Sequence, residues 1–203
     1  ADAGVKVRLL ADGIAGRMFM LDNPAFRALE AHPNVEVRLY NLFRQATPWK
    51  HMGRMHDKYV IVDDEAYILG GRNMFDHFIG EYPDSAQSRD REALVVNAGG
   101  GADSSLFQVR EYFEGMWDHP ETSTFSKGIG EDEREAVYRQ LRDRLAGLKR
   151  EKPDLFATAD YAAMTVPTRG VWLVSNPTTI YAKRPTAFTQ LFALLRLAES
   201  DIV

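Results

Sequence analysis

Hydrophobic and polar residues alternate along two early segments of the chain, and a helical pattern lies between them. Residues 5–10 and 35–40 alternate apolar with charged side chains, which predicts two β-strands. Residues 23–31 begin with a helix cap and a proline and place apolar residues at helical spacing, which predicts a helix. Because a helix between two strands carries the chain back across the sheet, we expect the strands to be parallel. Asp12 and Gly13 predict a turn after the first strand.

A second pair of strands is predicted in the middle of the chain. Residues 59–62 form a continuous apolar run, three acidic residues at 63–65 interrupt it, and residues 66–69 are apolar again. This pattern predicts two strands joined by a turn. Gly70 and Gly71 follow the second strand, and a glycine pair lets the backbone come close to another group.

The remaining pattern predicts further helices and short strands. The expected elements are a loop at 75–88, strands at 88–96, 171–174 and 201–203, helices at 104–117, 131–150 and 185–199, and a loop at 119–131.

An irregular segment at residues 41–54 carries Arg44, Trp49 and Arg54. Two interpretations of this segment remain open. It can be a solvated loop with a buried tryptophan, or a rim that contacts an anionic substrate or head group.

Composition narrows the possible functions. The chain has 203 residues, of which 45% are hydrophobic, so it can bury a substantial core. It contains no cysteine, which excludes disulfides and thiolate metal sites. Its formal net charge of −4 argues against a domain devoted to nucleic acid, because such domains are usually basic. The apolar runs are too short to predict a membrane-spanning helix.

Candidate chemistry is concentrated in residues 55–73. His56 and Lys58 directly precede an apolar strand, and alternation along a strand places both on one face. An imidazole and an ammonium side by side are tolerated in water or near an anion. Arg72 and Asn73 place hydrogen-bond donors beside the glycine pair. This segment therefore combines an imidazole that can act as a nucleophile, a cation, a backbone that another group can approach closely, and an amide donor. Together these groups could bind and attack a phosphate diester.

The spacing H-x-K-x4-D-x6-G-G-x-N resembles the signature of the phospholipase D superfamily. The matching positions are His56, Lys58, Asp63, Gly70, Gly71 and Asn73. The common form of the signature has serine where this chain has Gly71. The sequence Gly-Gly-Arg-Asn followed by Met-Phe-Asp resembles that of the bacterial cardiolipin synthase branch of the superfamily. The resemblance covers residues 1–119 well and implies an α/β fold with a mixed, largely parallel sheet and helices on both faces.

The resemblance also implies a two-step displacement at phosphorus. His56 would attack and form a phosphohistidine, a second histidine would protonate the leaving alcohol, and water or another alcohol would then attack. Lys58 and Asn73 would meet the negative charge on the non-bridging oxygens, so no metal or other cofactor is required. Asp63 ends the strand and is expected to hold the turn. The expected substrate-binding residues are Gly70, Gly71 and Arg72.

A carboxylate is expected to orient the nucleophilic imidazole. Asp90 and Glu92 share one face of the predicted strand at 88–96. The resemblance assigns this role to an acidic residue just before the apolar part of the strand, where Asp90 matches best and Glu92 second. The alternative for either is a surface salt bridge with Arg89 or Arg91.

Most members of the superfamily carry two repeats, each with its own motif, whereas this sequence contains one. We expect residues 1–120 to be a first repeat without its N-terminal element, 121–168 a helical connector, and 169–203 the incomplete beginning of a second repeat. The chain is therefore predicted to be a segment of a longer two-repeat protein. A natural one-motif protein that pairs as a homodimer is the alternative.

Three function hypotheses follow. The first is a phosphatidyltransferase or phospholipase D acting on anionic phospholipid, the second a homodimeric nuclease or phosphodiesterase, and the third a catalytically silent binding module. The net charge disfavours nucleic acid as a substrate, and the intact motif disfavours a silent module. The expected partners are a phosphodiester substrate, a second motif from the same or another chain, and a membrane surface. The resemblance implies a location in the bacterial cytoplasm or at the inner-membrane periphery. With one motif, these 203 residues alone are expected to be inactive.

Overall fold

The computed structural model of this chain describes residues 1–73, 90–161, 163–168, 170–175 and 185–199. Contacts divide the chain into two compact units. The first comprises Ala1–Met55 and Gly115–Ala159, and the second comprises His56–Glu114 and Asp160–Val203. The loop predicted at 75–88 and the strand predicted at 201–203 lie outside the described residues. Within the described part of the chain, no helix is both long and apolar enough to cross a membrane.

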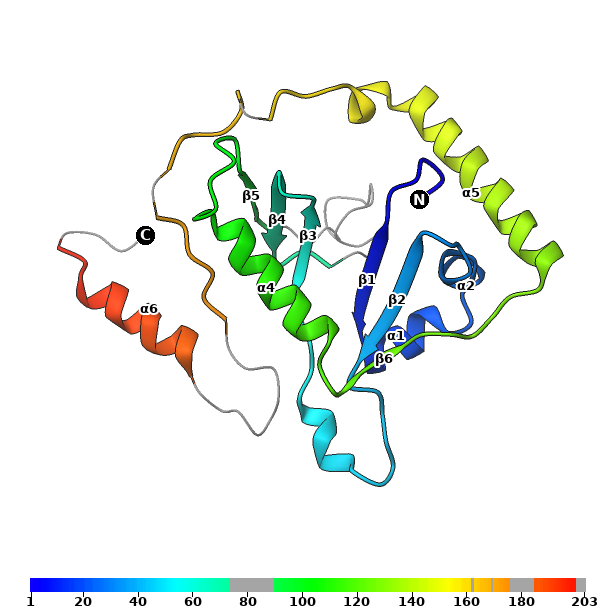
Figure 1. Ribbon diagram of the computed structural model, residues 1–203, viewed down its shortest axis with the longest axis horizontal. Helices are drawn as coiled ribbons and strands as arrows, with labels where there is room; N and C mark the ends of the chain where they lie inside the picture. The colour runs from blue at the N-terminus through cyan, green and yellow to red at the C-terminus, as the bar shows by residue number, and fades with distance from the viewer. Residues whose placement is uncertain (74–89, 162, 169, 176–184, 200–203) are drawn as a thin grey trace, which may run out of the picture. The chain divides into compact units, whose positions relative to one another are not determined.

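The first unit contains a three-stranded sheet in the order β1-β2-β6. Strand β1 (Val7–Asp12) pairs in parallel with β2 (Val35–Tyr40), with Val7 opposite Val35. The two predicted strands and their parallel pairing are confirmed (Figure 1). Strand β6 (Thr122–Thr124) runs antiparallel on the other side of β2, within the segment that the sequence predicted as a loop.

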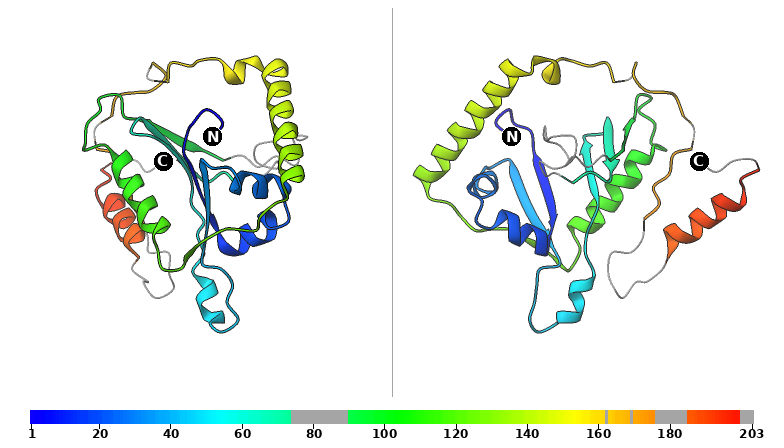
Figure 2. Two further views of the ribbon diagram at one scale, coloured as in Figure 1. Left: turned by 45° about the vertical axis from the view of Figure 1, so that its right-hand side comes forward. Right: turned by 180° about the vertical axis from the view of Figure 1, so that it is seen from behind.

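Three helices belong to the first unit. Helices α2 (Pro24–Glu30) and α5 (Glu131–Glu151) confirm the predicted helices, and α5 packs against α2 (Figure 2). Helix α1 (Gly13–Met20) stands where a turn was predicted. It forms because the Asp12 carboxylate caps its first turn, accepting hydrogen bonds from the backbone N–H groups of Ile14 and Ala15.

The core of the first unit lies between β2 and these helices. Val37 and Leu39 are buried on β2 and pack with Met20 of α1 and with Phe125, which follows β6. Burial of each of these side chains contributes about 1.5–3 kcal/mol. Packing in this core therefore holds β6 and α1 against β2, although neither segment has a clear strand or helix pattern of hydrophobic residues.

The end of β1 is joined to the chain that follows the irregular segment. Asp12 Oδ2 accepts hydrogen bonds from Arg54 Nε at 2.9 Å and from the backbone N–H of Met55 at 3.1 Å. Arg54 also donates to the carbonyl of Asn41, a residue with a positive φ of 51° at the end of β2. One carboxylate thus holds the first turn of α1 with one oxygen and residues 54–55 with the other.

The second unit contains an antiparallel sheet in the order β3-β4-β5. Strands β3 (Lys58–Val62) and β4 (Ala66–Gly70) form the predicted hairpin, and β5 (Glu92–Val96) pairs with β4. Helix α4 (Ser105–Trp117), whose residues up to Glu114 belong to this unit, lies along one face of the sheet (Figure 1).

Alternation along the strands explains which face the helix covers. Tyr67 of β4 is buried against Leu106 and Val109 of α4, and its hydroxyl shares a 2.9 Å hydrogen bond with Ser105 Oγ. Tyr59 of β3 packs around the same cluster. Because side chains alternate along β3, Lys58 projects from the opposite face of the sheet.

The shorter elements agree only in part with the sequence prediction. The helix predicted at 185–199 is confirmed as α6 (Thr186–Arg196). Residues 171–174 form no strand, and the Leu173 N–H instead donates to the side chain of Gln108 at 2.8 Å. Short 3-10 turns lie at Pro48–Met52 and Pro153–Phe156. Of the two interpretations of the irregular segment, the loop with a buried tryptophan is contradicted, because Trp49 is 57% exposed.

The α/β class of the chain is confirmed. The sheets are smaller and less parallel than expected, because among the described pairings β1–β2 is parallel and the other three are antiparallel. The repeat boundaries at residues 120 and 168 describe relatedness in sequence rather than contacts, so they stay a prediction.

Candidate active site

The motif begins where β3 begins. His56 lies exposed two residues before the Lys58 side chain, which is half-buried. Lys58 Nζ donates a 2.6 Å hydrogen bond to the backbone carbonyl of His56. The amine is therefore held close to the backbone from which the candidate nucleophile projects.

Strand register places a row of three positions across the sheet. Lys58 lies opposite Gly70, and Gly70 lies opposite Glu92. Opposed residues in an antiparallel ladder project from the same face, so Lys58 and Glu92 flank a position that carries no side chain. A Cβ on Gly70 would lie 2.3 Å from Glu92 Cγ and 2.8 Å from the carbonyl oxygen of Arg91. The close approach of β5 thus requires glycine here.

Arg72 joins the chain leaving β4 to the chain entering β5. Its Nε donates to Glu92 Oε1 at 2.9 Å, and its Nη2 donates to the backbone carbonyl of Asp90 at 3.1 Å. These contacts rigidify the glycine turn. A substrate-binding role for Arg72 stays a prediction, and a phosphate would have to share the guanidinium with Glu92.

Asp90 packs against the second glycine. A Cβ on Gly71 would lie 2.5 Å from Asp90 Oδ2 and 2.8 Å from Oδ1, so the carboxylate occupies the space of a missing side chain. Asp90 Oδ1 also accepts a 2.8 Å hydrogen bond from the N–H of Arg91. Glu92, the second candidate, is paired with Arg72. Asp90 thus lies beside Gly71 and Glu92 beside Gly70, and the role of Asp90 in orienting His56 stays a prediction.

Two carboxylates influence the charge of Lys58. Partial burial lowers the pKa of Lys58, and the negative charges of Asp57 and Asp90 oppose this effect. Asp57 is not among the site residues predicted from the sequence. Alternation could have shown that Asp57 faces away from Lys58, toward the helix side of the sheet, where Tyr112 Oη donates a 2.8 Å hydrogen bond to Asp57 Oδ2.

Asp63 and Asn73 lie at different ends of the hairpin. Asp63 is in the turn after β3 with a positive φ of 44°, and its carbonyl accepts a 2.7 Å hydrogen bond from Arg110 of α4. Asp63 lies five positions after Lys58, which along an extended strand corresponds to about 17 Å. Arg110 also forms an ion pair with Asp64. Asn73 is half-buried after the glycine turn. The structure therefore brings Lys58 near the glycine turn and places Asp63 apart from it.

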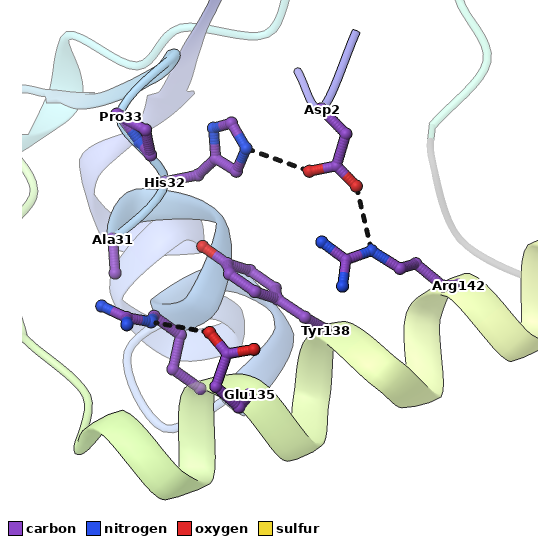
Figure 3. Close-up of a pocket in the computed structure, with 8 residues that line it drawn as sticks. Asp2, Ala31, His32, Pro33, Glu135, Tyr138 and Arg142 are labelled. Atoms are coloured by element: carbon purple, nitrogen blue, oxygen red, sulfur yellow. Dashed lines mark hydrogen bonds and ion pairs between the residues drawn. The ribbon is translucent and has the colours of Figure 1, made fainter.

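The described residues also contain a pocket of about 280 Å³ in the first unit (Figure 3). His32 Nδ1 accepts a hydrogen bond from the N–H of Asn34, so its Nε2 carries the proton and donates to Asp2 Oδ1 at 3.1 Å. Arg142 of α5 donates to the other Asp2 oxygen at 3.0 Å, and both contacts lower the pKa of Asp2, Arg142 the more strongly. These charges satisfy one another, so we interpret the cluster as a fastening between the N-terminus and α5. Neither here nor elsewhere among the described residues is a group of three or more acidic or histidine side chains arranged to hold a metal ion.

Comparison with known proteins agrees with the motif. A family model described as the phospholipase D-like domain of cardiolipin synthase matches residues 1–117. A cardiolipin synthase C from Escherichia coli is 38% identical over 89 residues, which are 39% of this chain and 18% of that protein. An uncharacterised protein from Helicobacter pylori is 32% identical over 130 residues, which are 58% of this chain and 24% of that protein. No solved structure gives a significant match.

The chain spans 24% or less of the length of these curated relatives. The matching family model nevertheless covers more than half of the chain and includes every residue of the motif and of the β3-β4-β5 sheet that presents it. The chain therefore belongs to the phospholipase D superfamily and carries a cardiolipin synthase-type domain in residues 1–117.

Proposed function

We propose that this chain supplies one half of a phosphodiester-processing site that acts on anionic phospholipid, as a phosphatidyltransferase or a phospholipase D. The observation that carries this proposal is the hydrogen bond from Lys58 Nζ to the backbone carbonyl of His56, which holds a half-buried cation at the backbone of the residue with the exposed imidazole. Membership of the phospholipase D superfamily supports the reaction class.

The proposed reaction has two displacements at phosphorus. In the first, a ring nitrogen of His56 attacks phosphorus, an N–P bond forms and the P–O bond to the leaving alcohol breaks. A second histidine, from another part of a longer protein or from a homodimer mate, gives its proton to the departing oxygen. In the second, the unprotonated second histidine takes the proton from water or an acceptor alcohol as its oxygen attacks phosphorus, the N–P bond breaks and both histidines are restored.

The surrounding residues would stabilise the charge that builds up on the phosphoryl oxygens. Lys58 supplies a cation, and Asn73 supplies an amide donor after the glycine turn. Gly70 and Gly71 let Glu92 and Asp90 approach the strand end beside Lys58, because a side chain at either glycine would clash with them. Asp90, beside Gly71, is the residue that we assign to orienting His56.

An anionic phospholipid is favoured over nucleic acid as the substrate. The formal net charge of −4 gives no general attraction for a polyanion, whereas one local cation is sufficient for a single phosphodiester. The name of the Escherichia coli relative, cardiolipin synthase C, supports the same choice. We propose a location in the bacterial cytoplasm or at the periphery of the inner membrane.

The half-site can be tested with a substrate that needs no general acid. Bis(p-nitrophenyl) phosphate has a leaving group stable enough to depart unprotonated, so the first displacement should proceed without the second histidine. We expect a single phosphoryl adduct on His56, detected by mass spectrometry of the 203-residue chain after rapid acid-free digestion. The adduct should be absent in His56→Ala and present in His32→Ala, which removes the histidine of the pocket in the first unit.

Natural substrates provide the second arm of this test. The chain alone should not turn over phosphatidylglycerol vesicles or single-stranded DNA. Absence of the aryl phosphate adduct would contradict the proposed nucleophile. Sustained vesicle turnover by a monomer that depends on His56 would contradict the half-site, and DNA binding that persists at high salt would favour the nuclease hypothesis.

A further inference from the structure

Asp57 lies between the two candidate catalytic residues in sequence and is held from the helix side of the sheet. Tyr112 Oη donates to Asp57 Oδ2 at 2.8 Å. Strand alternation directs Asp57 away from the face that carries Lys58. The Asp57 carboxylate therefore links the segment that carries His56 and Lys58 to helix α4, on the face of the sheet opposite to Lys58.

Tyr112 can hold Asp57 in place because helix α4, which carries Tyr112, is packed against the sheet. Leu106 and Val109 of α4 are buried against the sheet, and Tyr112 follows on the same side at helical spacing. The ring of Tyr112 packs edge to face on Tyr59 at 6.3 Å, and Tyr59 is buried enough that its pKa is raised. The hydroxyl of Tyr112 is thus presented from a packed helix rather than from a mobile loop.

We propose that Tyr112 is a positioning residue that acts through Asp57 and fixes the backbone from which His56 and Lys58 project. This inference rests on the proposed function of His56 and Lys58. Residues 56 and 57 precede the first residue of β3, so strand pairing does not hold them. The hydrogen bond from the Tyr112 hydroxyl to Asp57 restrains the chain at these two residues.

The hydrogen bond between Tyr112 and Asp57 also fixes the position of a negative charge that acts on Lys58. Burial lowers the pKa of Lys58, while Asp57 and Asp90 act in the opposite direction. The Tyr112 hydroxyl holds the exposed Asp57 carboxylate in its supporting position, whereas a released carboxylate can rotate away from it. Loss of the hydroxyl is therefore expected to lower the pKa of Lys58, in addition to loosening the His56 backbone.

The test compares two tyrosines that differ in what they hold. Tyr112→Phe removes the hydroxyl and keeps the ring packed on Tyr59. Tyr138→Phe is the matched control, because the Tyr138 hydroxyl also donates a single 2.8 Å hydrogen bond, to the carbonyl of Ala28 in the first unit. Both variants should fold, and urea unfolding should show similar, small losses of stability for the two.

The decisive measurements are made on the whole 203-residue chain by NMR. The pKa of the Lys58 amine is followed through its side-chain carbon shifts, and inorganic phosphate is titrated as the probe of the site. In Tyr112→Phe we expect a lower Lys58 pKa, shifted His56 ring signals and about fivefold weaker phosphate binding. In Asp57→Asn the Lys58 pKa should fall further, and in Tyr138→Phe all three readouts should match the wild type.

The two proposals fail in different ways. If the wild-type chain does not bind phosphate, the proposed function is contradicted, while the Lys58 and His56 signals still decide the positioning role. If Tyr112→Phe leaves the Lys58 pKa and the His56 signals at their wild-type values, Tyr112 is not a positioning residue, whatever the phosphate affinity.

Discussion

The carboxylate of Asp90 occupies the place of a side chain on Gly71, with Oδ2 only 2.5 Å from where a Cβ would lie. The neighbouring glycine meets a different obstacle. A Cβ on Gly70 would meet Glu92 Cγ at 2.3 Å and also the backbone where β5 begins, at 2.8 Å from the Arg91 carbonyl oxygen and 3.0 Å from Glu92 Cα. The two glycines of the motif thus serve different purposes, because a carboxylate can turn aside and a paired strand cannot.

Gly71→Ala should change the electrostatics of the site more than the stability of the fold. The new methyl group would turn the Asp90 carboxylate away and break its 2.8 Å hydrogen bond to the Arg91 N–H, at a cost of about 1 kcal/mol. Because the charge of Asp90 supports protonation of Lys58, the pKa of Lys58 should fall. An NMR titration of Lys58 checks this, and an unchanged pKa would contradict the arrangement.

Gly70→Ala should mainly destabilise the second unit. The methyl group can be accommodated only if β5 moves away from β4, and overpacking of this kind costs about 1–3 kcal/mol. Urea unfolding of the variant beside Gly71→Ala provides the measurement. Equal stability of the two variants would show that β5 does not approach Gly70 as closely as described.

Lys58→Met should be relatively more stable at neutral than at alkaline pH. Burial lowers the folded-state pKa of Lys58, while the unfolded chain keeps the ordinary value of 10.5. Between these two values the unfolded chain binds more protons, so the wild type gains stability as the pH rises through this window. Methionine binds no proton. The stability of Lys58→Met minus that of the wild type should therefore decrease from pH 7 toward 10.5, and urea unfolding across this range tests the sign.

Asp12→Ala should destabilise the first unit far more than the loss of an ordinary helix cap. Asp12 caps α1 and also accepts hydrogen bonds from Arg54 and from the Met55 N–H, so its removal should cost roughly 3 kcal/mol. Asn23→Ala is the matched control, because the Asn23 side chain caps only the first turn of α2 and should cost about 1 kcal/mol. Similar losses in urea unfolding would contradict the double role of Asp12.

Helix α1 shows why the sequence pattern predicted only part of the fold. The strands and helices that carry clear period-two or helical patterns were found close to their observed bounds. Helix α1 turns Gly16 and Met20 toward the sheet, whereas Met18 and Phe19 are 72% and 51% exposed. A helix that packs through glycine and leaves its large side chains outside reverses the usual pattern. Strand β6 was missed because its pairing with β2 depends on residues far away in the sequence.

The site was predictable to the extent that its chemistry is local. His56, Lys58 and the two glycines follow from spacing and alternation within one hairpin. The packing of Asp90 against Gly71 and the hydrogen bond from Tyr112 to Asp57 join residues 19 and 55 positions apart, and no periodicity within one element encodes them. They become visible only when strand register and the placement of α4 are known.

The lowered pKa of Lys58 has a practical consequence for chemical labelling. Acylating reagents attack only the neutral amine, and at a given pH a lysine with a lowered pKa exposes more of that form than a lysine in water. A limiting amount of an amine-directed reagent near neutral pH should therefore modify Lys58 early. A lower rate of Lys58 modification in the presence of a phosphodiester would then show that the bound phosphodiester shields the amine, without any need for turnover.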